Sequence, residues 1–100
     1  MDGPQVHLFV IETQKFPLGA LVATPPALAA IPPHEINAAI NRHAGGDWGD
    51  MDAHDRNANE QALKAGGRLF SQYASRAGEK FWIITEADRS STCVLLPEDY

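Results

Sequence analysis

Three segments in the last third of the chain carry the clearest structural pattern: Arg68-Leu-Phe-Ser-Gln-Tyr73, then Lys80-Phe-Trp-Ile-Ile-Thr-Glu-Ala-Asp-Arg89, then Ser90-Ser-Thr-Cys-Val-Leu-Leu-Pro97. Side chains in these segments alternate with the period of two that is typical of strands. Gly78 lies in the connection between the first two segments, where a residue that tolerates a positive φ angle favours a hairpin turn. The sequence therefore predicts a three-stranded antiparallel meander.

The residues before this meander carry helix signals. Thr24 and the two prolines after it favour a short helix, because threonine caps free amides and proline at the first helical position loses no hydrogen bond. Apolar residues at spacings of three and four predict a second helix over residues 35–42. Asp52 as the cap and Gly66 as the terminator predict a third, polar helix over residues 53–65. We expect an α+β fold, with N-terminal helices packed on a C-terminal three- to four-stranded antiparallel sheet.

One hundred residues are enough for one small domain, which we assign to residues 16–100. Residues 16–23 suit a short strand. Residues 1–15 fit an edge strand or a flexible lead-in, because their apolar residues alternate loosely before a proline-containing stretch. The N-terminus lacks the pattern of a secretory signal, and no segment is apolar enough to span a membrane, so we expect a cytoplasmic protein.

The formal net charge of −5 argues against a chain built for nonspecific nucleic-acid binding, which needs a basic surface. It leaves room for a local basic patch, because most of the arginines lie apart from the acid-rich residues 47–60. The spacing of His43, Asp47, Asp50 and His54 matches no recurrent metal site, and the single cysteine offers no pair of thiolates. We therefore expect no metal and no cofactor.

A first polar cluster is Asn41-Arg-His-Ala-Gly-Gly-Asp-Trp-Gly-Asp50. Its His43 has the chemistry of a general base, and it equally suits a cation at the C-terminus of a helix. Trp48 suits a core anchor or a ring that stacks on a partner. We regard this cluster as a candidate site with both interpretations open.

A second cluster follows the strands. An arginine beside acids and hydroxyls suits phosphate-bond chemistry, because a guanidinium offsets phosphoryl charge and a carboxylate moves the proton. The same residues also fit a structural turn, in which Asp88 caps backbone amides and Arg89 pairs with Glu86. The members of the cluster are Arg68, Ser71, Tyr73, Thr85, Glu86, Asp88, Arg89, Ser91 and Thr92.

Several blocks carry a resemblance to a known family: Arg42-His-Ala-Gly-Gly-Asp-Trp-Gly49, Gly67-Arg-Leu-Phe-Ser-Gln-Tyr73, Trp82-Ile-Ile-Thr-Glu-Ala-Asp-Arg-Ser90 and Leu95-Leu-Pro-Glu-Asp-Tyr100, together with Asn59, Ala62 and Leu63. These blocks resemble a family of short uncharacterised bacterial proteins found on plasmids and other mobile elements. The resemblance covers residues 16–100. It implies a mobile-element accessory protein and names no activity.

Helices followed by an antiparallel meander also resemble, more distantly, the superfamily of barnase, RelE toxins and colicin ribonucleases. This resemblance implies a toxin that cleaves RNA by metal-independent acid/base catalysis, with His43 or Glu86 as general base and Arg68 and Arg89 as phosphate clamps. No histidine follows Trp82, so Arg89 stands where such enzymes tend to place the acid. We assign contacts with RNA to Arg42, Trp48, Tyr73, Asp88, Ser91 and Thr92.

Two further hypotheses need no catalysis. The charge of −5 suits an acidic interaction or inhibitor protein that mimics nucleic acid and binds a host or phage nucleic-acid-handling machine. Asp50, Asp52 and Asp55 are the acids that we expect to face such a partner. The other hypothesis is a homodimer that forms by pairing exposed strand edges, with both polar clusters structural.

Overall fold

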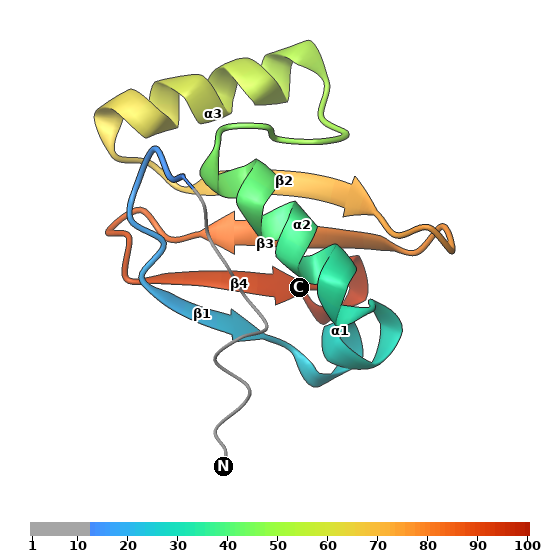
Figure 1. Ribbon diagram of the computed structural model, residues 1–100. Coiled ribbons are helices and arrows are strands. Elements are labelled where there is room, and N and C mark those ends of the chain that lie inside the picture. Colours follow the sequence, from blue (N-terminus) through green and yellow to red (C-terminus); the bar gives the residue numbers. More distant parts are fainter. Residues whose placement is uncertain (1–12) are drawn as a thin grey trace.

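The computed structural model describes residues 13–100, and the α+β fold predicted from the sequence is confirmed (Figure 1). The prediction of an edge strand or lead-in over residues 1–15 falls largely on residues 1–12, which lie outside the described residues. In chain order the elements are β1 (Ala20–Ala23), α1 (Pro25–Ala30), α2 (Pro33–Ala44), α3 (Ala53–Ala65), β2 (Leu69–Ala74), β3 (Lys80–Thr85), β4 (Ser91–Leu95) and the short 3₁₀ turn η2 (Pro97–Asp99).

The four strands form one sheet in the order β1-β4-β3-β2. Strands β2, β3 and β4 are the predicted antiparallel meander, in which Ser71 pairs with Ile83 and Ile83 with Val94. The prediction that the whole sheet is antiparallel is wrong, because β1 runs parallel to β4, with Leu21 beside Thr92. The chain leaves β1 through helices instead of a hairpin turn, so no tight connection imposes antiparallel pairing on this strand.

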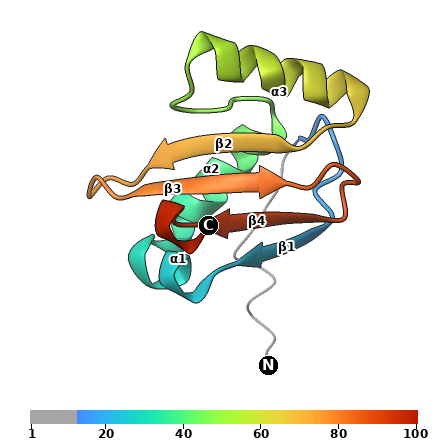
Figure 2. The ribbon, with the colours of Figure 1, turned by 180° about the vertical axis from the view of Figure 1, so that it is seen from behind.

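Helices α1 and α2 lie on one face of the sheet, and α3 lies beside β2 (Figure 1). On the opposite face, the described part of the chain places the short η2 turn over β3 and β4 (Figure 2). The predicted alternation is confirmed, since Leu69, Ser71 and Tyr73 of β2 are all buried on the helix side. The core therefore forms between α1, α2 and the inner face of the sheet.

The local helix signals act as the sequence predicts. The hydroxyl of Thr24 accepts a hydrogen bond from the amide of Ala27 at 3.2 Å, and α1 ends at Ala30, two residues before a proline. Asp52 accepts from the amide of Asp55 at 2.8 Å, which caps α3. Gly66 then ends α3 in the left-handed conformation at φ 86°.

The loop between α2 and α3 packs along the outer edge of β2. The amide of Gln72 donates to the carbonyl of Trp48 at 3.2 Å, and the amide of Asp50 donates back to the carbonyl of Gln72 at 2.7 Å. Gly49 makes this approach possible, since its φ is 75° and a Cβ there would lie 2.1 Å from the carbonyl oxygen of Gln72. The loop therefore occupies a stretch of strand edge that would otherwise pair with another chain.

A side chain of α3 completes the protection of this edge. The amide group of Asn59 donates to the carbonyl of Phe70 at 2.7 Å and its oxygen accepts from the amide of Phe70 at 3.0 Å. It thus makes the two hydrogen bonds that a neighbouring strand would make. Asn59 is 4% exposed, although it lies in a helix whose other described residues are not buried. This contact fixes α3 against β2.

Candidate functional site

The two polar clusters predicted from the sequence meet inside the protein. His43 in α2 has no exposed surface. Its Nδ1 lies 2.6 Å from the hydroxyl of Ser71, and its Nε2 lies 2.9 Å from that of Thr85. The hydroxyl of Thr85 lies 2.7 Å from that of Thr92, which donates to the carbonyl of Leu18 at 2.7 Å. We call this set, from Ser71 through His43, Thr85 and Thr92 to the Leu18 carbonyl, the buried polar chain.

The last hydrogen bond sets the direction of the others. Because Thr92 donates its proton to a carbonyl, its oxygen accepts the proton of Thr85. Thr85 then accepts the Nε2–H of His43, and Nδ1 accepts the proton of Ser71. These directions place a proton on Nε2, and the low pKa of His43 selects the neutral imidazole, in which Nδ1 accepts. Burial, together with the positive charge of Arg89, lowers the pKa of His43 to about 3.

A hydroxyl beside an imidazole is also a feature of nucleophilic sites. Whether Ser71 and His43 could act in this way depends on whether a substrate can reach them. Ser71 and His43 both have no exposed surface. A general base must lie within hydrogen-bond reach of its substrate, directly or through one water, and this pair is enclosed by the core. What the arrangement does in the described fold is hold α2 against β2 and β3.

Trp48 also lies in the core. Its interpretation as a core anchor is confirmed, because it is 2% exposed. Its ring stacks with that of Phe16 at a centroid distance of 6.3 Å and meets the imidazole of His43 edge-on at 5.6 Å. The indole Nε1 donates to the carboxylate of Glu60 at 2.9 Å. The polar end of the indole is thus satisfied by α3, as a buried tryptophan requires.

Arg89 binds backbone carbonyls from two parts of the chain. Its guanidinium donates to the carbonyl of Gly67 at 2.6 Å and to that of Ala62 at 3.2 Å, near the end of α3. It also donates to the carbonyls of Glu86 and Ala87 in its own turn. The cation lies at the C-terminal end of α3, where it interacts favourably with the helix dipole, and the Ala62 carbonyl that it contacts also accepts the amides of Gly66 and Gly67. Arg89 thus pairs with Glu86, as the turn interpretation predicts, and the contact is with the backbone carbonyl of Glu86.

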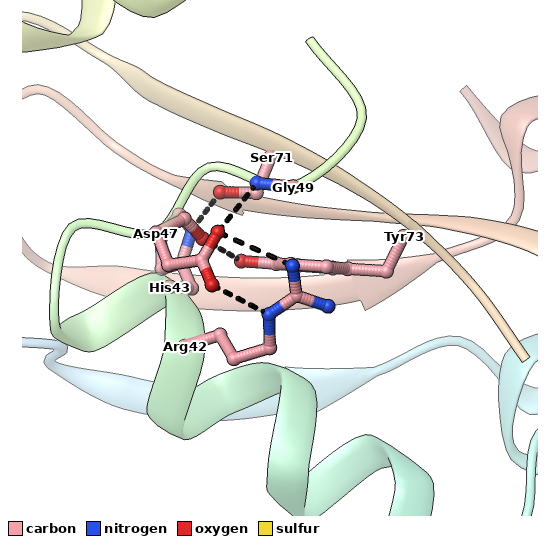
Figure 3. A network of polar contacts seen from close by, with 6 residues as sticks. All are labelled: Arg42, His43, Asp47, Gly49, Ser71 and Tyr73. Atoms are coloured by element: carbon pink, nitrogen blue, oxygen red, sulfur yellow. Dashed lines mark hydrogen bonds and ion pairs between the residues drawn. The ribbon is translucent and has the colours of Figure 1, made fainter.

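A second network, next to Ser71 and His43 of the buried polar chain, joins Arg42, Asp47 and Tyr73 beside α2 (Figure 3). Arg42 donates to the two carboxylate oxygens of Asp47 at 2.8 and 3.2 Å, and its guanidinium lies 4.8 Å from the ring centroid of Tyr73. The hydroxyl of Tyr73 donates to the carbonyl of Asp47 at 2.6 Å. The hydrogen bond from Arg42 lowers the pKa of Asp47, and burial raises the pKa of Tyr73. These contacts tie the loop after α2 to β2.

The remaining predicted residues lie near the other face or in turns. Arg68 donates to the hydroxyl of Tyr100 at 2.8 Å and lies 3.4 Å from the carboxylate of Glu86, and both members of that ion pair are almost half exposed. Asp88 accepts from the amide two residues ahead at 3.0 Å, as the turn interpretation predicts. Ser91 begins β4, beside β1.

The structure therefore places His43 and Thr92 in one hydrogen-bonded chain, with Arg89 close enough to influence the imidazole. Arg68 and Glu86 form a separate, exposed pair. His43 and Thr92 thus come together inside the core and not around a cleft. A catalytic role for these side chains stays a prediction.

A groove of about 590 Å³ opens between α3 and the face of β2 and β3 that α1 and α2 leave uncovered. Phe70 and Trp82 contribute aromatic rings to it, with centroids 4.7 Å apart. The indole of Trp82 donates to the side-chain oxygen of Gln72 at 2.9 Å, and the Gln72 amide donates to the carbonyl of Asp50 at 3.2 Å. We call this hollow the open-face groove; it is lined by Asp50, Met51, Asp52, Asp55, Ala58, Asn59, Arg68, Phe70, Gln72 and Trp82.

The side of the open-face groove that α3 and the loop before it contribute is acidic. Asp52 uses its carboxylate to cap α3. The carboxylates of Asp50 and Asp55 form no ion pair with any residue of the described range 13–100. Arg68 is the cation of the lining, and Glu86 already pairs with it. The groove thus combines aromatic rings with carboxylates that are available to a ligand.

Sequence reasoning singled out the acids of this groove but missed its aromatic part. Phe70 and Gln72 alternate with buried residues of β2, so they point away from α1 and α2. Trp82 does the same in β3 and pairs in register with Gln72. The available signal was the placement of aromatic residues at outward positions of two consecutive strands, where polar residues are the usual choice for a face that water covers.

Within residues 13–100, no three His, Cys, Asp or Glu side chains gather in a way that could hold a metal ion. The helices of this range are all too short or too polar to cross a membrane. No family model, curated protein or solved structure matches this chain. The resemblances to mobile-element proteins and to ribonucleases accordingly stay predictions.

Proposed function

We propose that this protein is a non-catalytic interaction domain that binds a basic surface of a host or phage nucleic-acid-handling protein through the open-face groove. The observation that carries this proposal is the pair of carboxylates of Asp50 and Asp55, which face a groove of about 590 Å³ without an ion-pair partner in the described chain. A hollow of this size falls within the range of roughly 300–1,000 Å³ that is usual for small-ligand pockets, so it has room for a side chain of a partner.

The contacts of the candidate catalytic residues support binding over catalysis. His43 is enclosed, and a pKa of about 3 makes it a poor proton acceptor near neutral pH. The guanidinium of Arg89 is occupied by backbone carbonyls. Arg42 has Asp47 as its partner. An RNA phosphate would have to displace these contacts before it could bind the guanidinium of Arg42 or Arg89.

The charge of the whole chain supports the same role. A net charge of −5 attracts a basic partner over distance, and acids beside a groove concentrate that field where contact occurs. Proteins that handle nucleic acids carry basic grooves for the phosphate backbone. An acidic domain that occupies such a groove would compete with nucleic acid for it.

The test is a pull-down from nuclease-treated host lysate with two matched variants. Asp50→Asn with Asp55→Asn removes two negative charges from the groove. Glu79→Gln with Glu98→Gln removes two exposed charges from the β2–β3 turn and from η2, outside the groove. We expect the groove variant to lose about 90% of a stoichiometric partner, corresponding to two charged contacts of roughly 0.7 kcal/mol each, while the control variant retains it.

Equal recovery of the partner by both double variants would overturn the proposal, because the groove acids would then add nothing to the interaction. A lysate that yields no partner at all would count against it as well. Cleavage of RNA by the wild-type protein, lost on changing His43, would return the ribonuclease hypothesis to first place. Unfolding by urea checks that both variants keep their fold, with stability expected within about 0.5 kcal/mol of wild type for such surface changes.

A further inference from the structure

We infer that the group bound in the open-face groove is an arginine side chain from a basic segment of the partner, held by the rings of Phe70 and Trp82 and by the carboxylates of Asp50 and Asp55. This inference rests on the proposed function and names the chemistry of its partner. The groove supplies both halves of an arginine site from separate elements: the rings come from β2 and β3, and the acids from the loop and the first turn of α3.

The aromatic half favours a cation with a flat face. Phe70 and Trp82 are each partly exposed in the groove, with ring centroids 4.7 Å apart. A cation placed over such a ring within about 6 Å of its centroid is attracted by the negative face of the ring. A guanidinium also stacks on the ring and sheds its water more readily than an ammonium. The rings therefore favour arginine over lysine.

The acidic half supplies the charge. Asp50 precedes α3 and Asp55 lies in its first turn, and both line the groove. A guanidinium presents several N–H donors in one plane, so it can bond to one carboxylate in bidentate fashion and still reach a second. Asp52 is less suited to this, because it already accepts the amide of Asp55. The two unpaired carboxylates are thus the anchors that we assign to the bound cation.

Single-stranded nucleic acid is the strongest rival occupant, because bases also stack on exposed aromatic rings. The charges of the groove oppose it. Asp50, Asp52 and Asp55 line the hollow, and the cation Arg68 is paired with Glu86. A phosphate backbone would meet three carboxylates and no free guanidinium in this lining, whereas a basic peptide gains from the same groups.

Two tryptophans make the test direct. In the ¹⁵N-labelled full chain, the indole N–H of Trp82 reports on the groove, and that of Trp48, buried in the core, serves as the internal reference. The probes are a glycine–serine peptide that contains arginines, the same peptide with lysines, and oligouridine. We expect the arginine peptide to shift the Trp82 resonance and leave Trp48 in place, and to bind about threefold tighter than the lysine peptide.

The matched variants test which side chains bind the peptide. Asp50→Asn with Asp55→Asn should lower the affinity for the arginine peptide by about tenfold. Glu79→Gln with Glu98→Gln should lower that affinity by less than about twofold. Trp82→Leu should abolish the preference for arginine over lysine. Should that variant fail to fold, the Trp82 shift in the wild-type protein still decides the matter. Equal binding of the two peptides without a Trp82 shift overturns the inference.

The outcomes separate this inference from the function on which it rests. If oligouridine shifts Trp82 and displaces the peptide, the groove is a nucleic-acid site and both proposals fall. If the lysate partner depends on Asp50 and Asp55 while the peptides show no arginine preference, the interaction domain stands and the arginine site is overturned. If the arginine peptide binds as expected, the inference is supported whether or not a given lysate contains the partner.

Discussion

The two faces of the sheet carry polar side chains for opposite reasons. On the inner face, Ser71, Thr85 and Thr92 are fully buried and hydrogen-bonded in one chain with His43. Beside the outer face, the carboxylates of Asp50 and Asp55 in the open-face groove form no ion pair within the described chain. Polar residues that satisfy one another stabilise a fold, whereas those left without a partner are available to a ligand. The polar clusters of the sequence contain residues of both kinds, and residue type alone does not distinguish a satisfied polar side chain from an available one.

The largest loss of stability is expected from a change at His43. His43→Ala should lower the free energy of unfolding by about 3–5 kcal/mol, because it leaves a cavity and removes the partner of two buried hydroxyls. Urea denaturation followed by tryptophan fluorescence measures this loss. His34→Ala is the matched control, since the side chain of His34 is 75% exposed, and we expect a change below about 0.5 kcal/mol. Similar stabilities for the two variants would show that the buried polar chain contributes little.

Asn59 lines the groove, and yet it is buried and hydrogen-bonded like the residues of the inner face. Asn59→Ala should cost about 2–3 kcal/mol of stability, since the amide and carbonyl of Phe70 lose their partners at the edge of β2. The exposed Asn57 in the same helix gives the control, Asn57→Ala, with little expected change. Hydrogen exchange at the amide of Phe70 should quicken in the Asn59 variant. An unchanged exchange rate there would contradict the role that we assign to Asn59.

The smallest predicted effect is a slope in the dependence of stability on pH. The pKa of His43 is about 3 in the folded protein, below its ordinary value of 6.5. As the pH falls below 6.5 the unfolded chain takes up this proton first, so stability decreases toward pH 3 by up to roughly 1.4 kcal/mol per pH unit. Unfolding curves between about pH 6 and 4.5, a window above the ordinary carboxyl pKa values, measure this slope.

His43→Gln, which does not titrate, should lack this contribution to the slope. The ring protons of His43 provide a second reading in the wild-type protein, because their NMR shifts should stay constant over the same window. A titration midpoint near pH 6.5 for those protons would show that water reaches the imidazole, and it would contradict the burial of His43 in the core.

Local signals predicted the elements because each depends on a few neighbouring residues. The bounds of α3 follow from Asp52 as its cap and Gly66 as its terminator, and the structure has α3 at Ala53–Ala65 as predicted. The hairpin after β2 has Gly78 at φ 90°, as its place in the turn requires. Burial of alternate residues in β2 likewise follows from the period of a strand.

Long-range contacts escaped prediction because no local pattern encodes them. The parallel pairing of Leu21 with Thr92 joins residues that lie 71 positions apart, and the chain between them leaves both orientations open. Asn59 resembles any polar residue of an exposed helix until β2 is placed beside it. Trp82 appears in the sequence as a strand residue, and only the packing of α3 turns its outward position into part of a groove.

Caps, periodicity and composition are local properties, and from them the helices, the meander, the shared face of alternate strand residues and the acidic charge of the chain could be predicted. The position of His43 in the core, and of Asp50 and Asp55 beside a hollow, emerges only when the chain is folded. The burial of a polar group, and therefore its pKa and its freedom to bind, depends on which distant residues surround it.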